Sequence, residues 1–392
     1  MSFLDYILLA YVLLGCVYWL WMAVGAWRIT RAVPVLAAVQ APDPQPWPRL
    51  SVVIPACNEA DTLEAAVRTI LSQDYPDLEV ILIDDRSSDA TGALIDRIAA
   101  SDARVRPLCI TELPEGWLGK VHALWCGSQQ AGGDWLLFTD ADVHLAPGML
   151  RRAVAYAEAR GLGHLAAAPD LRAGSLILDA AISQFLRTFC VGMRCWAVGD
   201  PKSRACIGVG AFNLVRRAAL AQTEGFPWLR LEVADDLALG MMLKRAGARS
   251  CLVNASGWLA VDWYRSVAEM ARGTEKAFAS VARCSVLRLL VVCAVLLALE
   301  WAPLVALLPI GPWGLLPAGL AMLAAAVASV VVLHRWAHRP ILPGLCFPLA
   351  AVFGVVLFLR AGWLGVRRGG AVWRGTLYPS KVLRQGSRVR FP

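Results

Sequence analysis

The stretch EVILIDDRSSDAT, from Glu79 to Thr91, decides the fold of this 392-residue chain. Its four apolar residues after Glu79 lead directly into the paired carboxylates Asp84 and Asp85. The stretch DWLLFTDADV, from 134 to 143, repeats the arrangement of an apolar run that ends in acidic residues. Open α/β sheets bind ligands at the carboxyl ends of their strands. Two acidic clusters placed there indicate a site that can hold a divalent cation.

Segments of strand and helix character alternate along the middle of the chain. Strands are predicted at 50–54, 79–83, 105–109 and 135–139, with helices at 61–72, 89–100, 120–130 and 147–160. This alternation predicts an α/β fold: a mixed, mostly parallel sheet with helices on both faces. No G-x-G-x-x-G opens the first helix and no G-x-x-x-x-G-K-[ST] occurs, which counts against dinucleotide and P-loop sites.

The two ends of the chain are apolar. The chain is 58% hydrophobic, with 16 Trp and a mean hydropathy of +0.54, too apolar for an ordinary soluble enzyme. Segments of about one membrane span lie at 6–27, 289–310, 313–333 and 340–359. A secretory signal peptide is the competing interpretation of the first, but MSFLD carries no basic residue and the apolar run exceeds the usual ~7 to 15 residues. We therefore predict transmembrane helices at both ends.

Basic residues indicate how the chain meets the membrane. Arg28 and Arg31 directly follow the first apolar segment, so the positive-inside rule places the central domain in the cytoplasm. Residues 360–392 hold eight basic side chains and no acidic one, which equals the whole formal excess of +8. This tail is expected to meet anionic lipid headgroups. The charge balance of the remainder argues against a nucleic-acid partner.

The apolar segments leave the topology open. Four full crossings would put the basic tail opposite the central domain, against the positive-inside preference. One C-terminal segment is therefore expected to be re-entrant or interfacial, and the segment with Glu300 is the first candidate, since a carboxylate near the centre of a span is costly. Alternatively, Glu300 faces a neighbouring helix or a lipid acceptor.

The predicted organisation has six parts. They are an N-terminal anchor (1–28), a proline-rich linker (29–48), the catalytic domain (49–262), an amphipathic interfacial segment (263–288), transmembrane segments (289–360) and the basic tail (361–392).

Three ordered motifs resemble a known family. SVVIPACNEADTLEAAVRTILSQDYPDLEVILIDDRSSDAT (51–91), TDAD (139–142) and DDLALGMMLKRAG (235–247) are similar to family 2 inverting glycosyltransferases with the GT-A (nucleotide-diphospho-sugar transferase) fold. The anchor, WLGKVHAL (117–124) and WYRSVAEMARGTEKAFA (263–279) further resemble the bacterial membrane glycosyltransferases associated with hopanoid biosynthesis. That resemblance implies a multi-pass protein of the cytoplasmic (inner) membrane, a hexosyltransferase of EC class 2.4.

The resemblance assigns the nucleotide to the ends of the first two strands. Nucleotide contacts are implied for Pro55, Ala56, Asn58 and Glu59, and for Asp84 and Asp85, whose carboxylates would accept hydrogen bonds from base and ribose. A capping role for Asn58 or Asp61 is the alternative for the first group. A solvated turn is the alternative for the second.

The D-x-D motif is the expected metal site. Its alternate spacing directs Asp140 and Asp142 to one face of an extended segment. The resemblance implies that Asp142 coordinates Mg²⁺ or Mn²⁺ bridging the donor diphosphate, with Asp140 on the ribose or metal side. Such an ion would neutralise the leaving diphosphate, which is Lewis-acid catalysis by a hard cation with oxygen ligands. His144 is a further candidate ligand, with a structural role as the alternative.

The base and one cation complete the expected site. Asp235 and Asp236 stand where the family carries a Glu-Asp pair, and Asp236 is expected to deprotonate the acceptor hydroxyl. Asp235 is also expected to cap the following helix. Lys120, at a helix start, meets phosphate or else lies on the surface.

The sequence after Asp236 bears on whether the protein transfers one sugar or builds a polymer. No Q-x-x-R-W motif follows Asp236, whereas Tyr264, Arg265, Arg272 and Lys276 lie on a segment that suits the membrane surface. We therefore expect one sugar to pass from a UDP-sugar to a lipid acceptor. A processive polysaccharide synthase and a non-catalytic membrane scaffold are the alternatives.

Overall fold

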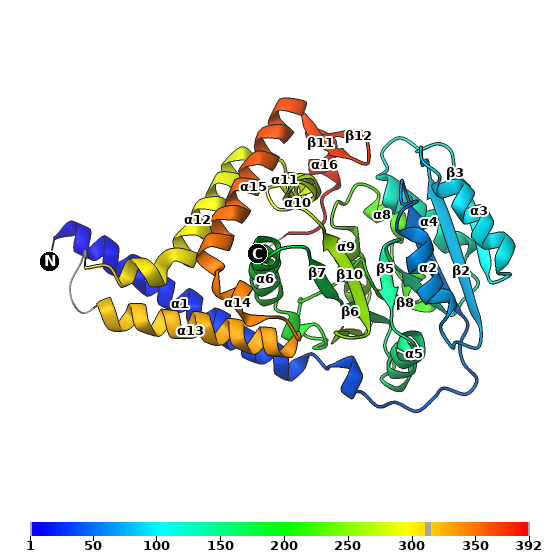
Figure 1. The fold of residues 1–392 in the computed structure, drawn as a ribbon, viewed down its shortest axis with the longest axis horizontal. Coiled ribbons are helices and arrows are strands. Elements are labelled where there is room, and N and C mark those ends of the chain that lie inside the picture. The colour runs from blue at the N-terminus through cyan, green and yellow to red at the C-terminus, as the bar shows by residue number, and fades with distance from the viewer. Residues whose placement is uncertain (1, 310–314, 391–392) are drawn as a thin grey trace.

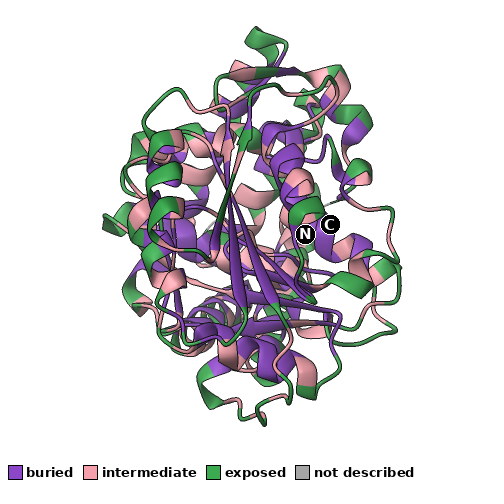
Figure 2. Cartoon of the chain, turned by 90° about the vertical axis from the view of Figure 1, so that its right-hand side faces the viewer, coloured by how far each residue is buried: buried purple, intermediate pink, exposed green. Residues whose placement is uncertain are grey.

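The central sheet of the computed structural model has seven strands in the order β3-β2-β1-β4-β8-β6-β9. The structure describes residues 2–309 and 315–390. Within this sheet β8 runs against its neighbours β4 and β6, and the other neighbouring pairs are parallel. Helices cover both faces of the buried strands (Figure 1, Figure 2). The predicted α/β class with a mostly parallel sheet is confirmed.

The strands form three sheets. The bounds are β1 Leu50–Ala56, β2 Leu78–Asp85, β3 Val105–Ile110, β4 Trp135–Phe138, β6 His164–Ala168, β8 Asn213–Arg216 and β9 Ser250–Asn254 in the central sheet, then β5 Val143–Leu145, β7 Asp170–Ala173 and β10 Leu259–Tyr264 in a second, and β11 Gly370–Trp373 with β12 Thr376–Pro379 in a hairpin.

The helices alternate with these strands and then dominate the C-terminal third. Their bounds are α1 Phe3–Ala32, α2 Leu63–Leu71, α3 Thr91–Ser101, α4 Gly119–Gln130, α5 Met149–Ala159, α6 Leu176–Gly192, α7 Arg217–Leu220, α8 Phe226–Leu229, α9 Asp235–Arg245, α10 Val267–Gly273, α11 Ala277–Ser280, α12 Val286–Ala306, α13 Leu316–Trp336, α14 Ile341–Leu345, α15 Phe347–Arg368 and α16 Ser380–Gly386, with 3₁₀ turns η1 Leu36–Ala38, η2 Cys195–Ala197 and η3 Thr274–Lys276.

The register of the central strands brings their carboxyl ends to one edge. In β1 and β2 nearly every residue is buried, as expected for parallel strands covered on both faces. Ala56 pairs with Asp84, and Val53 pairs with Phe138 of β4. The acidic residues that follow β2 and β4 therefore lie at the same edge of the sheet.

Four helices have the length and apolar composition to cross a membrane: α1, α12, α13 and α15. The prediction of four apolar segments is confirmed, although α1 continues to Ala32, beyond the predicted end of the anchor at residue 28. Less than two fifths of each apolar window is buried within the protein. The remaining apolar surface is available for lipid.

Helix α15 runs alongside α12 and between α1 and the turn η3 (Figure 1). Its first residue, Phe347, packs edge-on against Trp19, halfway along α1, with ring centroids 4.9 Å apart. Its last residue, Arg368, forms an ion pair with Glu275 of the turn η3. Arg339, just before α14, pairs with Asp179 of α6. The chain therefore enters α14 beside α6 and leaves α15 beside η3, and the side of the membrane on which the basic tail lies remains a prediction.

Glu300 lies in a buried ion pair, while the re-entrant path expected for its segment remains a prediction. Its side chain is fully buried in α12. One carboxylate oxygen accepts a hydrogen bond from the Tyr18 hydroxyl at 2.5 Å, and the other pairs with Arg187 Nη2 of α6 at 2.6 Å. The Arg187 guanidinium also stacks over Trp19. Of the two predictions for Glu300, the one in which it faces a neighbouring helix is correct.

The basic tail folds back onto the catalytic domain. β11 and β12 pair as a hairpin directly after α15. Arg374, in its turn, donates to the Cys57 carbonyl and pairs with Glu59. Further along, the backbone amides of Arg388 and Val389 donate to Glu232. The expectation that this tail lies against lipid headgroups is wrong for these residues, because they bind acidic and carbonyl groups of the protein.

Candidate active site

Four predicted site residues line one small cavity at the carboxyl edge of the sheet. Lys120 opens α4, Asp140 follows β4, and Asp235 and Asp236 open α9. All four line a cavity of about 10 Å³, together with Gly210 and Asn213 on the approach to β8 and several apolar side chains. Asp140 of the D-x-D motif and the pair Asp235 and Asp236 are therefore brought together with the lysine, whereas Asp84, Asp85 and Asp142 do not line this cavity.

Lys120 holds the carboxylates of the cavity together. Its Nζ lies 2.7 Å from Asp140 Oδ1 and 3.5 Å from Asp235 Oδ2. Burial alone would lower the pKa of Lys120, but Asp140 and then Asp235 and Asp236 raise it above its usual value. Burial raises the pKa of Asp235 despite Lys120, because Asp236 and Asp140 act in the same direction. The lysine is thus a partly buried cation within the site, and the alternative of an exposed surface lysine is wrong.

Backbone amides fix the orientation of Asp236. Its Oδ2 accepts from Gly210 N at 2.9 Å and its Oδ1 from Leu237 N at 2.7 Å. The expected cap by Asp235 is absent, because α9 begins at Asp235 itself and Ala234 occupies the N-cap without a side-chain bond. Asp235 instead turns toward Lys120.

Gly208 provides the space in which the Asp236 backbone lies. A Cβ at residue 208 would be 1.7 Å from the Asp236 carbonyl oxygen. Gly208→Ala is therefore expected to displace Asp236 and lower kcat about a hundredfold, the cost of roughly an ångström of misplacement. Gly199→Ala is the control, since its nearest neighbour, Ser250 O, is 3.9 Å away. Steady-state kinetics of both folded variants test this, and equal kcat values would contradict it.

The nucleotide-side residues are held by bonds within the protein. Asp84 Oδ1 accepts from Ser87 N at 3.1 Å. Asp85 is buried and receives two bonds from Arg86, at 2.8 and 3.2 Å. Both carboxylates lie at the end of β2, so the solvated-turn alternative is wrong for the buried Asp85.

The first strand ends in a tight turn with a similar internal network. Pro55 and Ala56 belong to β1. Asn58 has φ +57°, and its side-chain oxygen accepts from Ser88 N at 2.8 Å. Glu59 binds Thr62 and Arg374. Thr62 is the N-cap of α2 and makes no side-chain cap, so the capping alternative for Asn58 is wrong.

The D-x-D carboxylates suit a divalent cation. Burial first, then Asp140 and Glu59, raises the pKa of Asp142 to about 6. Burial would also raise the pKa of Asp140, but Lys120, Lys276 and Arg374 hold it below its usual value. Three neighbouring carboxylates disfavour one another's charge, and oxygen ligands are those that Mg²⁺ and Mn²⁺ take. Asp142 and Asp140 therefore fit such an ion, although the described residues contain no cluster of three His, Cys, Asp or Glu side chains in ligating arrangement.

His144 lies on β5, opposite Ala260 of β10. No contact among the described residues joins it to the D-x-D carboxylates, and its role as a ligand remains a prediction.

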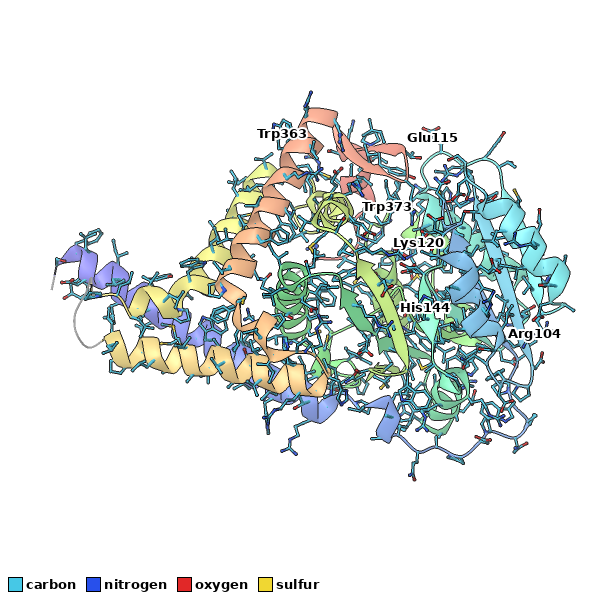
Figure 3. All side chains as sticks on the ribbon, in the orientation of Figure 1. Arg104, Glu115, Lys120, His144, Trp363 and Trp373 are labelled. Carbon is cyan, nitrogen blue, oxygen red and sulfur yellow. The ribbon has the colours of Figure 1, made fainter. Side chains whose placement is uncertain are left out.

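Lys276 lies at the site and was expected at the membrane surface. Its Nζ stacks over Trp373 at 4.7 Å from the ring centroid. Burial and the charge of Lys120 lower its pKa, while Asp236, Asp235 and Asp140 act against that shift. Trp373 and Lys120 lie at the same edge of the domain in Figure 3. The segment 263–288 is not one amphipathic helix, because β10 ends within it and α10, η3 and α11 follow.

Sequence reasoning missed the C-terminal contributions to the site. Arg374 contacts Glu59 and the Cys57 carbonyl, and the Tyr378 hydroxyl accepts from Gly119 N at 3.3 Å. These residues lie more than 230 positions from Lys120 along the chain. The eight basic residues of the tail were visible in the sequence, but the surface of the protein that they contact was not.

A buried histidine supports the Asp236 side of the site and gives a pH prediction. His164 Nε2 lies 2.7 Å from Asn213 Oδ1, and Asn213 Nδ2 donates to the Asp236 carbonyl at 3.3 Å. Burial lowers the pKa of His164 to about 4 from 6.5. The unfolded chain therefore binds this proton first, so folding stability falls as pH drops below 6.5 and levels off near pH 4.

The expected loss over that window is about 3 kcal/mol. Thermal unfolding of the purified protein at pH 7, 6, 5 and 4 tests it. In His164→Gln the dependence of stability on pH between 6.5 and 4 should vanish. The control His338→Gln, at an exposed histidine, should retain it. An unchanged slope in His164→Gln would contradict the assignment.

The fold is similar to that of a known glycosyltransferase. The family model for Glycosyl transferase family 2 matches residues 51–221, from β1 to the end of α7. The matched residues are thus similar to a family 2 glycosyltransferase domain, and the fold is GT-A-like. A mannosyltransferase from Pyrobaculum calidifontis, solved with GDP-Man and Mn²⁺, has a similar fold: the TM-score is 0.54 at 22% identity, over 90% of this chain and 99% of the other.

Curated relatives are also glycosyltransferases. A GalNAc(5)-diNAcBac-PP-undecaprenol beta-1,3-glucosyltransferase of Campylobacter jejuni is 35% identical over 103 residues, 26% of this chain and 32% of that protein. A beta-monoglucosyldiacylglycerol synthase of Synechocystis is 26% identical over 246 residues, 58% of this chain and 49% of that protein. The chain spans half or less of the length of these relatives.

Proposed function

We propose that this protein transfers one sugar, with inversion, from a nucleotide-diphosphate sugar to a lipid in the membrane. The observation that carries the proposal is the convergence of Lys120, Asp140, Asp235 and Asp236 on one cavity. Their elements sit at the sheet edge where α/β folds bind ligands. The family 2 match over residues 51–221 supports glycosyl transfer as the chemistry.

The chemistry needs one base and a stabilised leaving group. In the proposed reaction, Asp236 takes the proton of the acceptor hydroxyl. The hydroxyl oxygen then attacks the anomeric carbon from the face opposite the diphosphate. The bond from that carbon to the diphosphate oxygen breaks, and the nucleoside diphosphate leaves. The two amides on Asp236 hold its carboxylate in one orientation for this step.

Cations of this chain surround the proposed place of the diphosphate. Lys276 and Arg374 act on Asp140 from the C-terminal side, and Lys120 lies 2.7 Å from its carboxylate. We assign them to the negative oxygens of the donor. Asp142, with Asp140, would hold Mg²⁺ or Mn²⁺, and such an ion supplies Lewis-acid stabilisation of the leaving diphosphate.

A membrane lipid is the proposed acceptor. Helices α1, α12, α13 and α15 are long and apolar enough to place the catalytic domain at a bilayer. The named products or substrates of two relatives are lipid-linked, an undecaprenol diphosphate and a diacylglycerol. The motifs at 117–124 and 263–279 favour a hopanoid-like lipid, and Arg28 with Arg31 favours the cytoplasmic face of a bacterial inner membrane.

Radiolabelled donors test the proposal. The full chain in lipid nanodiscs would be incubated with Mg²⁺ or Mn²⁺ and with UDP- and GDP-sugars, of which a UDP-sugar is the proposed donor. Extracted lipids are then separated by chromatography. The expected result is label in one lipid band that carries one sugar. Label in long polymer would support a polysaccharide synthase instead, and the absence of any metal-dependent transfer or donor hydrolysis would favour a scaffold.

A further inference from the structure

A second cavity lies where the apolar helices meet the catalytic domain. Its volume is about 60 Å³. Side chains of α1, α6 and α13 line it together with the ends of β6 and β9, and much of the lining is apolar. It shares no lining residue with the cavity of Lys120 and Asp140. The proposed sugar transfer therefore does not account for it.

This cavity collects the unpartnered polar atoms of the protein. Among the residues that the structure describes, four buried side-chain polar atoms lack a hydrogen-bond partner, and all four belong to residues that line this cavity. They are Ser183 Oγ, Arg187 Nη1, Trp336 Nε1 and Arg339 Nε. Ser183 and Arg187 are more than nine-tenths buried. A buried polar atom without a partner is destabilising, so four around one space indicate a binding site for a polar group.

The chemistry of the unpartnered atoms selects that ligand. Guanidinium and indole nitrogens only donate, and a serine hydroxyl donates as well as accepts. Two side-chain acceptors of the lining, Asp170 and Asn254, already have donors. Asp170 accepts from Ser256 and from Gly257 N, and Asn254 Oδ1 accepts from Ser256 N. The ligand must therefore present several acceptor atoms close together.

Water satisfies this arrangement poorly. One water molecule has two lone pairs and can accept from at most two of the four unpartnered donors. A phosphodiester has acceptor oxygens and no donor. Both arginines keep a carboxylate partner, Arg187 with Glu300 and Arg339 with Asp179, at 2.6 Å each. What the cavity offers to such a group is the free hydrogen-bond donors of the two arginines rather than a surplus of positive charge.

The surroundings indicate a lipid as the source of that group. Outside the cavity, α6 exposes Leu176, Ile177 and Phe185, and α1 exposes Leu20 and Val24. These faces continue the apolar surface of the membrane helices. Pockets with basic groups between such helices bind lipid headgroups. We infer that this cavity is a binding site for the phosphodiester headgroup of a membrane phospholipid, which joins the helices to the catalytic domain.

Lipid binding by the delipidated full chain tests this inference. In an uncharged detergent, phosphatidylglycerol, a phosphate-free glucosyl diacylglycerol and inorganic phosphate would each be titrated, with the thermal unfolding midpoint and native mass spectrometry as readouts. Phosphatidylglycerol should raise the midpoint saturably and remain bound as one adduct. Trp336→Phe and Ser183→Ala should each weaken its Kd about tenfold, the loss of one bond to a charged group.

Trp301→Phe is the matched control, because the Trp301 indole already donates to the Pro348 carbonyl at 3.0 Å, and its phosphatidylglycerol Kd should equal that of the wild type. An equal response to the glucosyl lipid would overturn the phosphodiester, and an equal response to inorganic phosphate would overturn the lipid. If Trp336→Phe is more stable without lipid and binds phosphatidylglycerol normally, the inference is wrong. None of these readouts depends on sugar transfer, so failure here is distinct from failure of the proposed function.

Discussion

Asp236→Asn is expected to lower kcat about a thousandfold, within the 10²–10⁴-fold range of general-base catalysis. Asparagine keeps the size of the side chain and one oxygen for the Gly210 or Leu237 amide, but it cannot take the acceptor proton. Donor binding should change little, because the proposed diphosphate contacts come from other residues. Initial rates of lipid glycosylation and equilibrium binding of the donor measure the two effects separately.

The control for this experiment is Asp96→Asn. Asp96 is exposed on α3 and loses the same charge away from the site. Its kcat should equal that of the wild type. If Asp236→Asn retains more than a tenth of the wild-type kcat, Asp236 is not the base. Loss of donor binding together with kcat would indicate instead that Asp236 shapes the donor pocket.

Arg187→Met is expected to lower the free energy of unfolding by about 3–5 kcal/mol, because it leaves the carboxylate of Glu300 buried without its cation. The Arg187 and Glu300 side chains are 3% and 0% exposed. The double variant Arg187→Met/Glu300→Gln should regain most of this loss, since the Gln amide oxygen can still accept from Tyr18. Unfolding of the protein in mixed micelles, followed with increasing denaturing detergent, measures the difference.

An exposed ion pair serves as the comparison. Arg68 pairs with Glu64 one turn away on α2, with side chains 76% and 46% exposed. Arg68→Met should change stability by less than about 0.5 kcal/mol. If Arg187→Met is no more destabilising than Arg68→Met, the buried pair does not hold α6 to α12 as the geometry indicates.

Local patterns in the sequence were sufficient to predict the strands and acidic motifs. β1, β2 and β4 are continuous apolar runs, and the carboxylates at their ends follow directly from the chain order. The α/β class and the gathering of Asp140, Asp235 and Asp236 could therefore be predicted. The antiparallel strand β8 could not, because its four residues pair through register with β4 and β6 and carry no pattern of their own.

Contacts between distant segments were the features that sequence could not supply. Glu300 was identified as costly in a span, but its partner Arg187 lies 113 residues away on a helix that is not a span. Lys276 and Arg374 looked like cations for headgroups because basic residues beside apolar segments usually meet lipid. Only the packing of η3 and the hairpin on the catalytic domain shows that acidic and carbonyl groups of the protein are their partners.

The β11–β12 hairpin limits how the enzyme can be cut into parts. It is joined to the end of α15, while its turn reaches Glu59 at the end of β1. A soluble fragment made from the family-matched residues 51–221 would lack Asp235 and Asp236, and one extended to the end of α9 would still lack Lys276, Trp373 and Arg374. The excised globular domain therefore lacks residues of the candidate site, and a test of the proposed activity calls for the apolar helices and the hairpin on the same polypeptide.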